Sequence, residues 1–101
     1  MTVSEWLDAQ EAQGIDVSQI DLPEDLSYDA VPDETIYFNE FRPCSILCPE
    51  NHPYATVERF GRWYMSRGQD KAAGIHSTDG FWHLFTKDRD LAVETARSHV
   101  E

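Results

Sequence analysis

The residues best suited to metal chemistry are Cys44, Cys48 and His52, which follow one another at four-residue intervals. Thiolate and imidazole are ligands that zinc prefers, so this spacing could begin a structural zinc site. A tetrahedral site needs a fourth ligand, and one of the other histidines would have to supply it: His76, His83 or His99. We expect the cysteines to be reduced and packed as small apolar side chains, without a bound metal. A small zinc-stabilised adaptor and a redox switch remain alternatives.

A second candidate site is a pair of histidines on either side of Asp79-Gly80. This dipeptide favours a type I′ turn, because both of its positions tolerate a positive φ. A two-residue loop would place His76 opposite His83, with their Cβ atoms about 5 Å apart on one sheet face. Two imidazoles at that distance could share a metal or an anion. We interpret them as an ordinary pair of sheet residues, and a small enzyme or ligand-binding domain around His76 and His83 is a further alternative.

Motifs that carry catalysis are missing from the sequence. It contains no Gly-rich phosphate loop, no nucleophile elbow and no metalloprotease helix motif. Carboxylates are abundant near the amino terminus, but a cluster without a nearby base is typical of a surface rather than of acid/base machinery. The sequence therefore predicts a protein that is not an enzyme and that needs no cofactor.

Aromatic residues in the second half could form a platform for stacking nucleobases, particularly with three arginines close by. The residues concerned are Phe60, Trp63, Tyr64, Phe81, Trp82 and Phe85, with Arg59, Arg62 and Arg67. However, the formal net charge of -11 makes association with a phosphate backbone or an anionic membrane unfavourable. We therefore expect the aromatic residues to form a core with a few cation–π contacts, and we expect neither direct nucleic-acid binding nor membrane binding.

Acidic residues are concentrated in residues 1–41. Eleven Asp and Glu residues occur there without any Lys or Arg, whereas residues 42–101 contain eight bases and eight acids. The whole formal charge therefore belongs to the first segment, and the remaining body is neutral. A solvated face or a partly disordered tail would be the ordinary explanation of such a segment. Apolar residues recur throughout it, and this pattern favours a segment anchored on the body with its carboxylates directed outward.

An ordered row of carboxylates resembles a row of phosphates. Acids three or four residues apart on a helix lie about 5 to 6 Å from one another, which is comparable with phosphate spacing along a strand. We expect a non-enzymatic inhibitor that occupies the basic nucleic-acid-binding surface of a partner protein or nuclease complex. In size and charge the chain is similar to the anti-restriction and anti-CRISPR proteins of phages, and to immunity proteins or antitoxins that neutralise basic nucleases. The similarity is one of size and charge, and assigns no family.

In this hypothesis carboxylates select the partner and aromatic anchors supply affinity. The predicted contact acids are Glu5, Asp8, Asp16, Asp21, Glu24, Asp25, Asp29, Asp33 and Glu34. The predicted anchors are Trp6, Tyr28 and Tyr37.

The first half of the chain contains a helix, an irregular connection and a strand. Thr2 and Glu5 have the spacing of a capping box, which predicts a short helix through Gln13 with Gly14 as its stop. Residues 15–33 lack periodicity, and we expect one helical turn near 23–28. The β-branched and aromatic alternation in 35–41 predicts a strand.

In the second half, residues 55–67 fit either a helical stripe or two strands joined by a turn at Gly61, and we prefer the strands. Residues 72–77 and 81–86 are predicted to form a β-hairpin over 72–86. Asp88 can cap a final helix that runs to Val100, with Ala92, Val93, Ala96 and Val100 on one face.

These elements predict a single α+β domain over residues 1–101. A small antiparallel sheet packs with the C-terminal helix, and a short N-terminal helix and the acidic irregular segment complete it. The length allows one hydrophobic core of ordinary size. The sequence shows no basic segment followed by an apolar stretch of the kind that signals export. We therefore expect the protein in the cytoplasm of its own cell or of an infected host.

Overall fold

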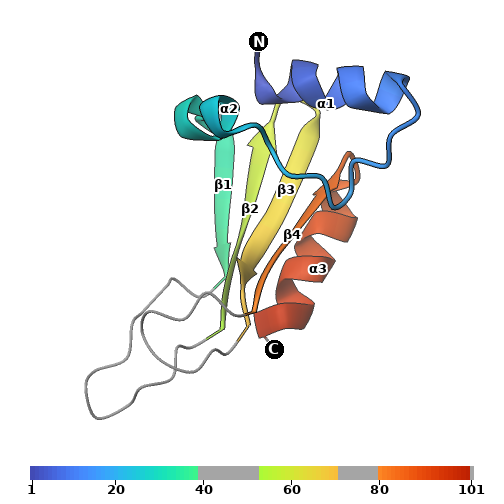
Figure 1. Cartoon of the computed structure of the whole chain (residues 1–101). Coiled ribbons are helices and arrows are strands. Elements are labelled where there is room, and N and C mark those ends of the chain that lie inside the picture. Colours follow the sequence, from blue (N-terminus) through green and yellow to red (C-terminus); the bar gives the residue numbers. More distant parts are fainter. Residues whose placement is uncertain (39–52, 71–79, 101) are drawn as a thin grey trace.

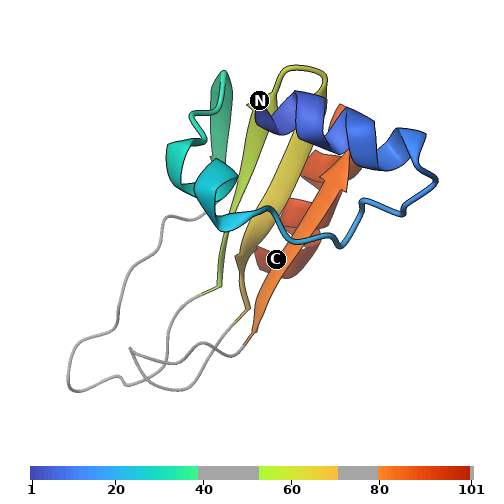
Figure 2. The ribbon, with the colours of Figure 1, turned by 45° about the horizontal axis from the view of Figure 1, so that its top comes forward.

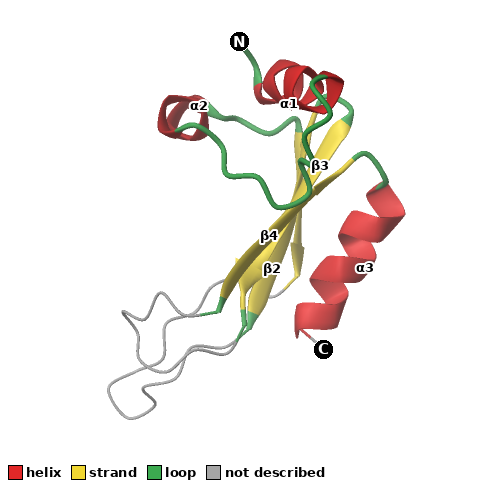
Figure 3. Cartoon of the chain, turned by 45° about the vertical axis from the view of Figure 1, so that its right-hand side comes forward, coloured by secondary structure: helices red, strands yellow, loops and turns green. Residues whose placement is uncertain are grey.

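A four-stranded antiparallel sheet with the strand order β1-β2-β3-β4 forms the centre of the molecule. The computed structural model describes residues 1–38, 53–70 and 80–100. The elements in chain order are α1 (Val3–Ala12), α2 (Glu24–Asp29), β1 (Glu34–Phe38), β2 (Tyr54–Phe60), β3 (Trp63–Gln69), β4 (Phe81–Thr86) and α3 (Arg89–Val100). One face of the sheet is covered by α3, and α1, α2 and the segment between them cross the other (Figures 1 and 3). The predicted α+β fold, with a sheet, a C-terminal helix and a short N-terminal helix, is confirmed.

Both long helices begin at the caps that the sequence indicated. The Thr2 side chain accepts a hydrogen bond from the Glu5 N–H, and Glu5 accepts one from the Thr2 N–H, so the capping box is complete. Gly14 follows α1 with a φ of 81°, a conformation that costs glycine little. The Asp88 carboxylate accepts from the N–H groups of Asp90 and Leu91 at the start of α3. Each cap satisfies backbone donors that the first turn of a helix leaves without partners.

Residues 55–67 form two strands joined by a turn, as expected from the sequence, and not a helix. Strands β2 and β3 pair antiparallel from Tyr54↔Gln69 to Phe60↔Trp63, and Gly61 in the turn has a φ of 64°. Side chains alternate between the two faces of a strand, and the apolar residues here occupy both faces. This double burial explains why periodicity alone did not separate strand from helix.

Strand β4 pairs with β3, while the predicted partner residues of the 72–86 hairpin lie outside the described residues. Phe81 lies opposite Gln69, and His83 lies opposite Arg67. On the other edge of β4, the Phe85 N–H donates to the Ser18 carbonyl, so that edge is already used by the acidic segment. Gly80 keeps the expected positive φ of 81°, but a turn signal does not say which strand the chain returns to. Residues 72–77 lie outside the described residues, as do 39–41 of the strand predicted over 35–41.

Two apolar clusters hold the layers together, one on each face of the sheet. Between α3 and the sheet, Ala92 and Ala96 are fully buried against Ala55 and Val57, and Val93 and Val100 pack around them as predicted. Small residues at this contact let the helix approach the strands closely. The opposite cluster contains Val3, Leu7, Val17, Phe60, Trp63, Met65 and Phe85.

The aromatic residues of the second half, which were expected to form a core rather than a stacking platform, are divided between these two clusters. Phe60, Trp63 and Phe85 are buried on the α1 side, which confirms their expected role in the core, whereas Tyr64 and Trp82 pack on the α3 side. Lys87 lies over Trp63 at 5.3 Å and Arg97 lies over Phe38 at 6.0 Å, so the cation–π contacts use cations other than the expected arginines.

The longest helix within the described ranges is α3, with 12 residues. No helix there has both the length and the apolar character that crossing a bilayer requires.

Candidate functional site: an acidic flank and a sheet groove

Four carboxylates of the acidic segment form ion pairs with the neutral body. Asp8 pairs with Arg62 and Glu11 with Lys87, each at 2.7 Å. The carboxylates of Asp33 and Glu34 lie 3.5 and 3.6 Å from the same guanidinium, that of Arg59. These pairs fasten the segment to the sheet and partly neutralise its charge, so the predicted contact acids Asp8, Asp33 and Glu34 are less available to a partner than the sequence suggested.

Asp8 has the richest set of contacts. Its Oδ1 accepts hydrogen bonds from Trp63 Nε1 at 2.8 Å and from Arg62 Nε and Nη2 at 3.0 and 2.7 Å. The Trp63 indole first, and then the Arg62 guanidinium, hold the pKa of Asp8 below its usual value, because they stabilise the carboxylate. The same pairing raises the pKa of Arg62. Asp8 therefore joins α1 to the β2–β3 turn.

Two other predicted contact acids are used locally. Glu5 closes the capping box, and its hydrogen bonds with Thr2 lower its pKa. Asp16 accepts from the Ser18 N–H at 3.0 Å, and that backbone hydrogen bond is the main cause of its lowered pKa. Both carboxylates stabilise the backbone that carries them.

The remaining predicted acids lie on and around α2. Asp21, Glu24, Asp25 and Asp29 are exposed, and none forms an ion pair with a Lys or Arg among the described residues. Asp21 is 3.8 Å from His83 Nε2, and its side chain is 95% exposed. We call this region the α2 flank, and it consists of Asp21, Glu24, Asp25, Tyr28, Asp29 and Val31.

The three predicted aromatic anchors differ in exposure. Tyr28 is 88% exposed and Tyr37 is 63% exposed, and Val31 beside them is 82% exposed. Trp6 is only partly exposed, because it packs against the apolar cluster under α1. Tyr28 and Tyr37 are thus free to contact a partner, whereas Trp6 contributes to the core.

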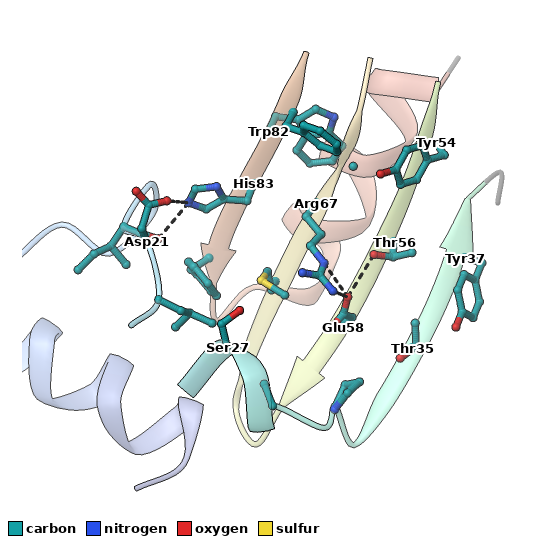
Figure 4. Close-up of a pocket in the computed structure, with 18 residues that line it drawn as sticks. Asp21, Ser27, Thr35, Tyr37, Tyr54, Thr56, Glu58, Arg67, Trp82 and His83 are labelled. Carbon is teal, nitrogen blue, oxygen red and sulfur yellow. Dashed lines mark hydrogen bonds and ion pairs between the residues drawn. The ribbon is translucent and has the colours of Figure 1, made fainter. Parts of the chain in front are cut away.

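The sheet face opposite α3 holds a groove of about 910 Å³. It is bounded by the strands and by the segment that carries Ile20, Leu22, Ala30 and Pro32 (Figure 4). The strand register places two rows of side chains across its floor. They are Tyr37–Thr56–Arg67–His83 and Thr35–Glu58–Met65–Phe85.

An ion pair lies at the centre of this groove. Glu58 Oε1 accepts from Arg67 Nε at 2.8 Å and Nη2 at 2.7 Å, and the Thr56 hydroxyl lies 3.4 Å away (Figure 4). The Glu58 side chain is only 9% exposed, whereas that of Arg67 is 52% exposed. A nearly buried carboxylate therefore depends on one half-exposed guanidinium.

The sequence patterns did not predict the groove. They placed Arg67 beside the aromatic residues and gave Glu58 no role. The signal that could have found them is the alternation of Thr56 and Glu58 with Ala55 and Val57, which gives β2 one polar face.

The predicted pair of His76 and His83 lies partly outside the described residues, and only the surroundings of His83 and His99 are described. His83 faces the groove, with Nε2 2.9 Å from the Ile20 carbonyl oxygen. His99 lies on α3, stacks on Trp82 at 4.0 Å, and has its Nδ1 2.7 Å from Asp70 Oδ1. His83 and His99 thus have separate partners on opposite sides of the sheet.

The proposed zinc ligands Cys44, Cys48 and His52, together with His76, lie outside the described residues. Within the ranges 1–38, 53–70 and 80–100, no three or more His, Cys, Asp or Glu residues are grouped so that they could hold a metal ion. The third histidine considered as a possible fourth ligand, His99, is engaged by Asp70.

Comparison of the chain with protein-family models, with curated proteins and with solved structures gave no significant match. Functional reasoning therefore depends on the geometry alone.

Proposed function

We propose that this chain is a non-enzymatic acidic protein that binds the basic nucleic-acid-binding surface of a partner protein, with the α2 flank at the centre of the contact. One observation carries the proposal. The carboxylates of the α2 flank have no Lys or Arg partner among the described residues, whereas Asp8 and Glu11 before them and Asp33 and Glu34 after them are paired with the body. Within residues 1–38, the carboxylates that have neither a Lys or Arg partner nor a local backbone hydrogen bond therefore lie in the α2 flank, and on the other face of the sheet Asp90 and Glu94 of α3 are also exposed.

The arrangement of this region suits a row of cations. Asp25 and Asp29 are four residues apart in α2, so their Cβ atoms lie about 5 to 6 Å from each other on one helix face. Positive side chains that normally contact successive phosphates have a comparable spacing. The exposed side chains of Tyr28 and Val31 stand beside these acids and supply apolar area. Carboxylates would govern the association rate and the choice of partner, and the apolar contacts would slow dissociation.

Ion pairs elsewhere in the segment support this function by holding the flank in place. Asp8 and Glu11 fix α1 before the flank, and Asp33 and Glu34 fix the chain after it. A binding surface held in its bound conformation loses less conformational entropy on association. The partner class that fits is a protein with a positively charged groove, such as a nuclease or a nucleic-acid-handling complex.

The test compares two double variants with the same change in net charge. E24Q/D25N neutralises the first turn of α2, and D90N/E94Q neutralises two exposed acids on α3 at the opposite side of the sheet. Each protein is immobilised, exposed to host lysate at low salt and eluted with a salt gradient. The captured basic protein is then purified and its affinity for each variant is measured.

We expect E24Q/D25N to elute at lower salt and to bind with a slower association rate, and D90N/E94Q to behave as the unaltered chain. The salt dependence follows because exposed charge pairs are screened over about 8 to 10 Å at physiological ionic strength. Binding that is insensitive to salt, or equal loss in both variants, would contradict the α2 flank as the contact.

A further inference from the structure

The two edges of the sheet differ in how their backbone groups are used. On the outer edge of β4, the Phe85 N–H donates to the Ser18 carbonyl at 3.0 Å, and the His83 carbonyl accepts from Gln19 Nε2 at 3.0 Å. The segment after α1 therefore covers this edge (Figure 2). On the outer edge of β1, no described residue forms a comparable hydrogen bond. An edge strand with unpaired N–H and C=O groups is a template for another strand.

The antiparallel register identifies which residues of β1 direct these groups outward. Successive residues of a strand direct their backbone groups to opposite neighbours, and paired residues share one phase. His83 and Phe85 direct their backbone groups away from β3. Their partners in β3, Arg67 and Met65, therefore direct theirs toward β2. The next residues in each row, Tyr37 and Thr35 of β1, then direct theirs outward. Ile36 directs its groups toward β2.

A bond at the start of β1 agrees with this phase. The Asp33 N–H donates to the Arg59 carbonyl oxygen at 2.8 Å, which places the Arg59 backbone oxygen on the β1 side of β2. The pairing of Glu34 with Arg59 then faces inward, and the next residue, Thr35, faces outward.

We infer that the outer edge of β1 is a strand-addition site that takes an extended basic segment of the partner protein. The backbone groups of Thr35 and Tyr37 supply the hydrogen bonds, as in other complexes in which a peptide extends a sheet. This inference depends on the proposed function for the sign of the partner's charge. It adds the location and the backbone conformation of the contact.

Charge selects a basic segment over a second copy of this chain. Two copies of β1 would bring together chains that each carry a net charge of -11, with Asp33 and Glu34 at the paired edges. A basic segment instead finds the α2 flank on the same side of the sheet, because Ser27 of α2 and the strand residues Thr35 and Tyr37 line one groove. Alternate side chains of the added strand would therefore face the flank's carboxylates.

Exposed apolar area lies at the same edge. Tyr37 is 63% exposed in the middle of β1, and Val31, which lies between α2 and β1, is 82% exposed. An added strand would cover part of both side chains. Edge strands in monomeric proteins are usually short, charged or covered, and β1 is short but presents this tyrosine.

The experiment uses the unaltered chain and a short synthetic peptide in which Lys alternates with Val and Thr. Amide hydrogen exchange is followed by NMR with and without the peptide. When the site is about 90% occupied, the exchange of the Thr35 and Tyr37 amides should slow by about tenfold, because only the unbound tenth of the molecules exchanges. The Ile36 amide is the internal control, since its hydrogen bond to β2 exists with or without peptide.

Two matched peptides separate backbone pairing from charge attraction. Replacing Lys with Glu should abolish binding, because the acidic flank repels the peptide. Methylating alternate peptide nitrogens on the edge that faces β1 keeps the charge but removes the donors, and it should also remove the protection of Thr35 and Tyr37.

The outcomes distinguish this inference from the proposed function. If the Lys peptide binds and its affinity falls with E24Q/D25N, but the Thr35 and Tyr37 amides stay unprotected, strand addition is overturned and the acidic contact survives. If the peptide does not bind at millimolar concentration, strand addition is also overturned, and the capture of a basic protein alone decides the proposed function.

Discussion

The Glu58–Arg67 pair in the groove yields a sharp prediction, because its two partners differ in burial. In Arg67→Met, the Glu58 carboxylate loses two hydrogen bonds while its side chain remains 9% exposed. Breaking a fully buried pair in this way costs about 3 to 5 kcal/mol. Since the Thr56 hydroxyl remains 3.4 Å from the carboxylate, and the groove is open enough to leave Arg67 half-exposed, we expect a smaller loss of about 1 to 3 kcal/mol in the free energy of unfolding.

The opposite variant should be milder. In Glu58→Met, the guanidinium of Arg67 is already 52% exposed and can turn toward solvent, so we expect a loss of about 1 kcal/mol or less. In E58M/R67M no charge is left unpaired, and replacing an ion pair by apolar groups of similar volume is often neutral. The double variant should therefore lie within about 1 kcal/mol of the unaltered chain, with a coupling energy of about 1 to 2 kcal/mol.

Urea unfolding followed by circular dichroism measures all four proteins. A thermal scan provides a second readout, because 1 kcal/mol corresponds to about 4 to 8 °C in Tm for a domain of 60 to 100 residues. Equal losses in the two single variants, or a double variant whose loss is the sum of both, would refute the argument from burial.

Three further predictions concern the packing of the acidic segment and the sheet. Leu7→Ala should lower the free energy of unfolding by about 2 to 5 kcal/mol because Leu7 is fully buried; Leu91→Ala, at a side chain 44% exposed, should cost less than about 1 kcal/mol in the same urea titration. Gly68→Ala should cost about 3 kcal/mol or more, or leave no folded protein, because a Cβ there would overlap a backbone carbonyl of β2. A normal yield with an unchanged Tm would contradict the strand register. The pKa of Asp8 in the folded state is lowered, chiefly by the hydrogen bond from Trp63. The ionised carboxylate therefore stabilises the fold above the unfolded-state pKa of about 3.9, and this stabilisation is lost as the pH falls through the folded-state pKa. The Tm difference between the unaltered chain and Asp8→Asn should therefore shrink as the pH is lowered from 5 to about 2.

Local signals in the sequence predicted the elements that depend on neighbouring residues. The capping box of Thr2 and Glu5 predicted α1, and Asp88 with its following apolar stripe predicted α3. The turn at Gly61 was found because a positive φ restricts the residue type. Each of these structures is decided by contacts within a few residues, which a single sequence displays directly.

The partner of β4 was not predictable in this way. The Asp79-Gly80 dipeptide favoured a local hairpin, but Phe85 packs in the core opposite Met65 of β3, and its N–H is bonded to Ser18. The pairing of β4 with β3 accompanies burial of Phe85 among residues far apart in the chain, which a local turn signal does not report.

The sequence alone established that the net negative charge belongs to residues 1–41, because a sum over a segment does not depend on positions in space. Which carboxylates remain available was decided only by the tertiary structure. The fold brings Arg59, Arg62 and Lys87 to some acids of the segment and leaves Glu24 and Asp25 without such a neighbour among the described residues. The groove, and the edge of β1 to which no described residue bonds, have the same origin, since each is formed by strands and connections that meet only when the chain folds. Coulomb attraction and hydrogen bonding act over a few ångströms, so their partners are set by distance in space rather than by distance along the sequence.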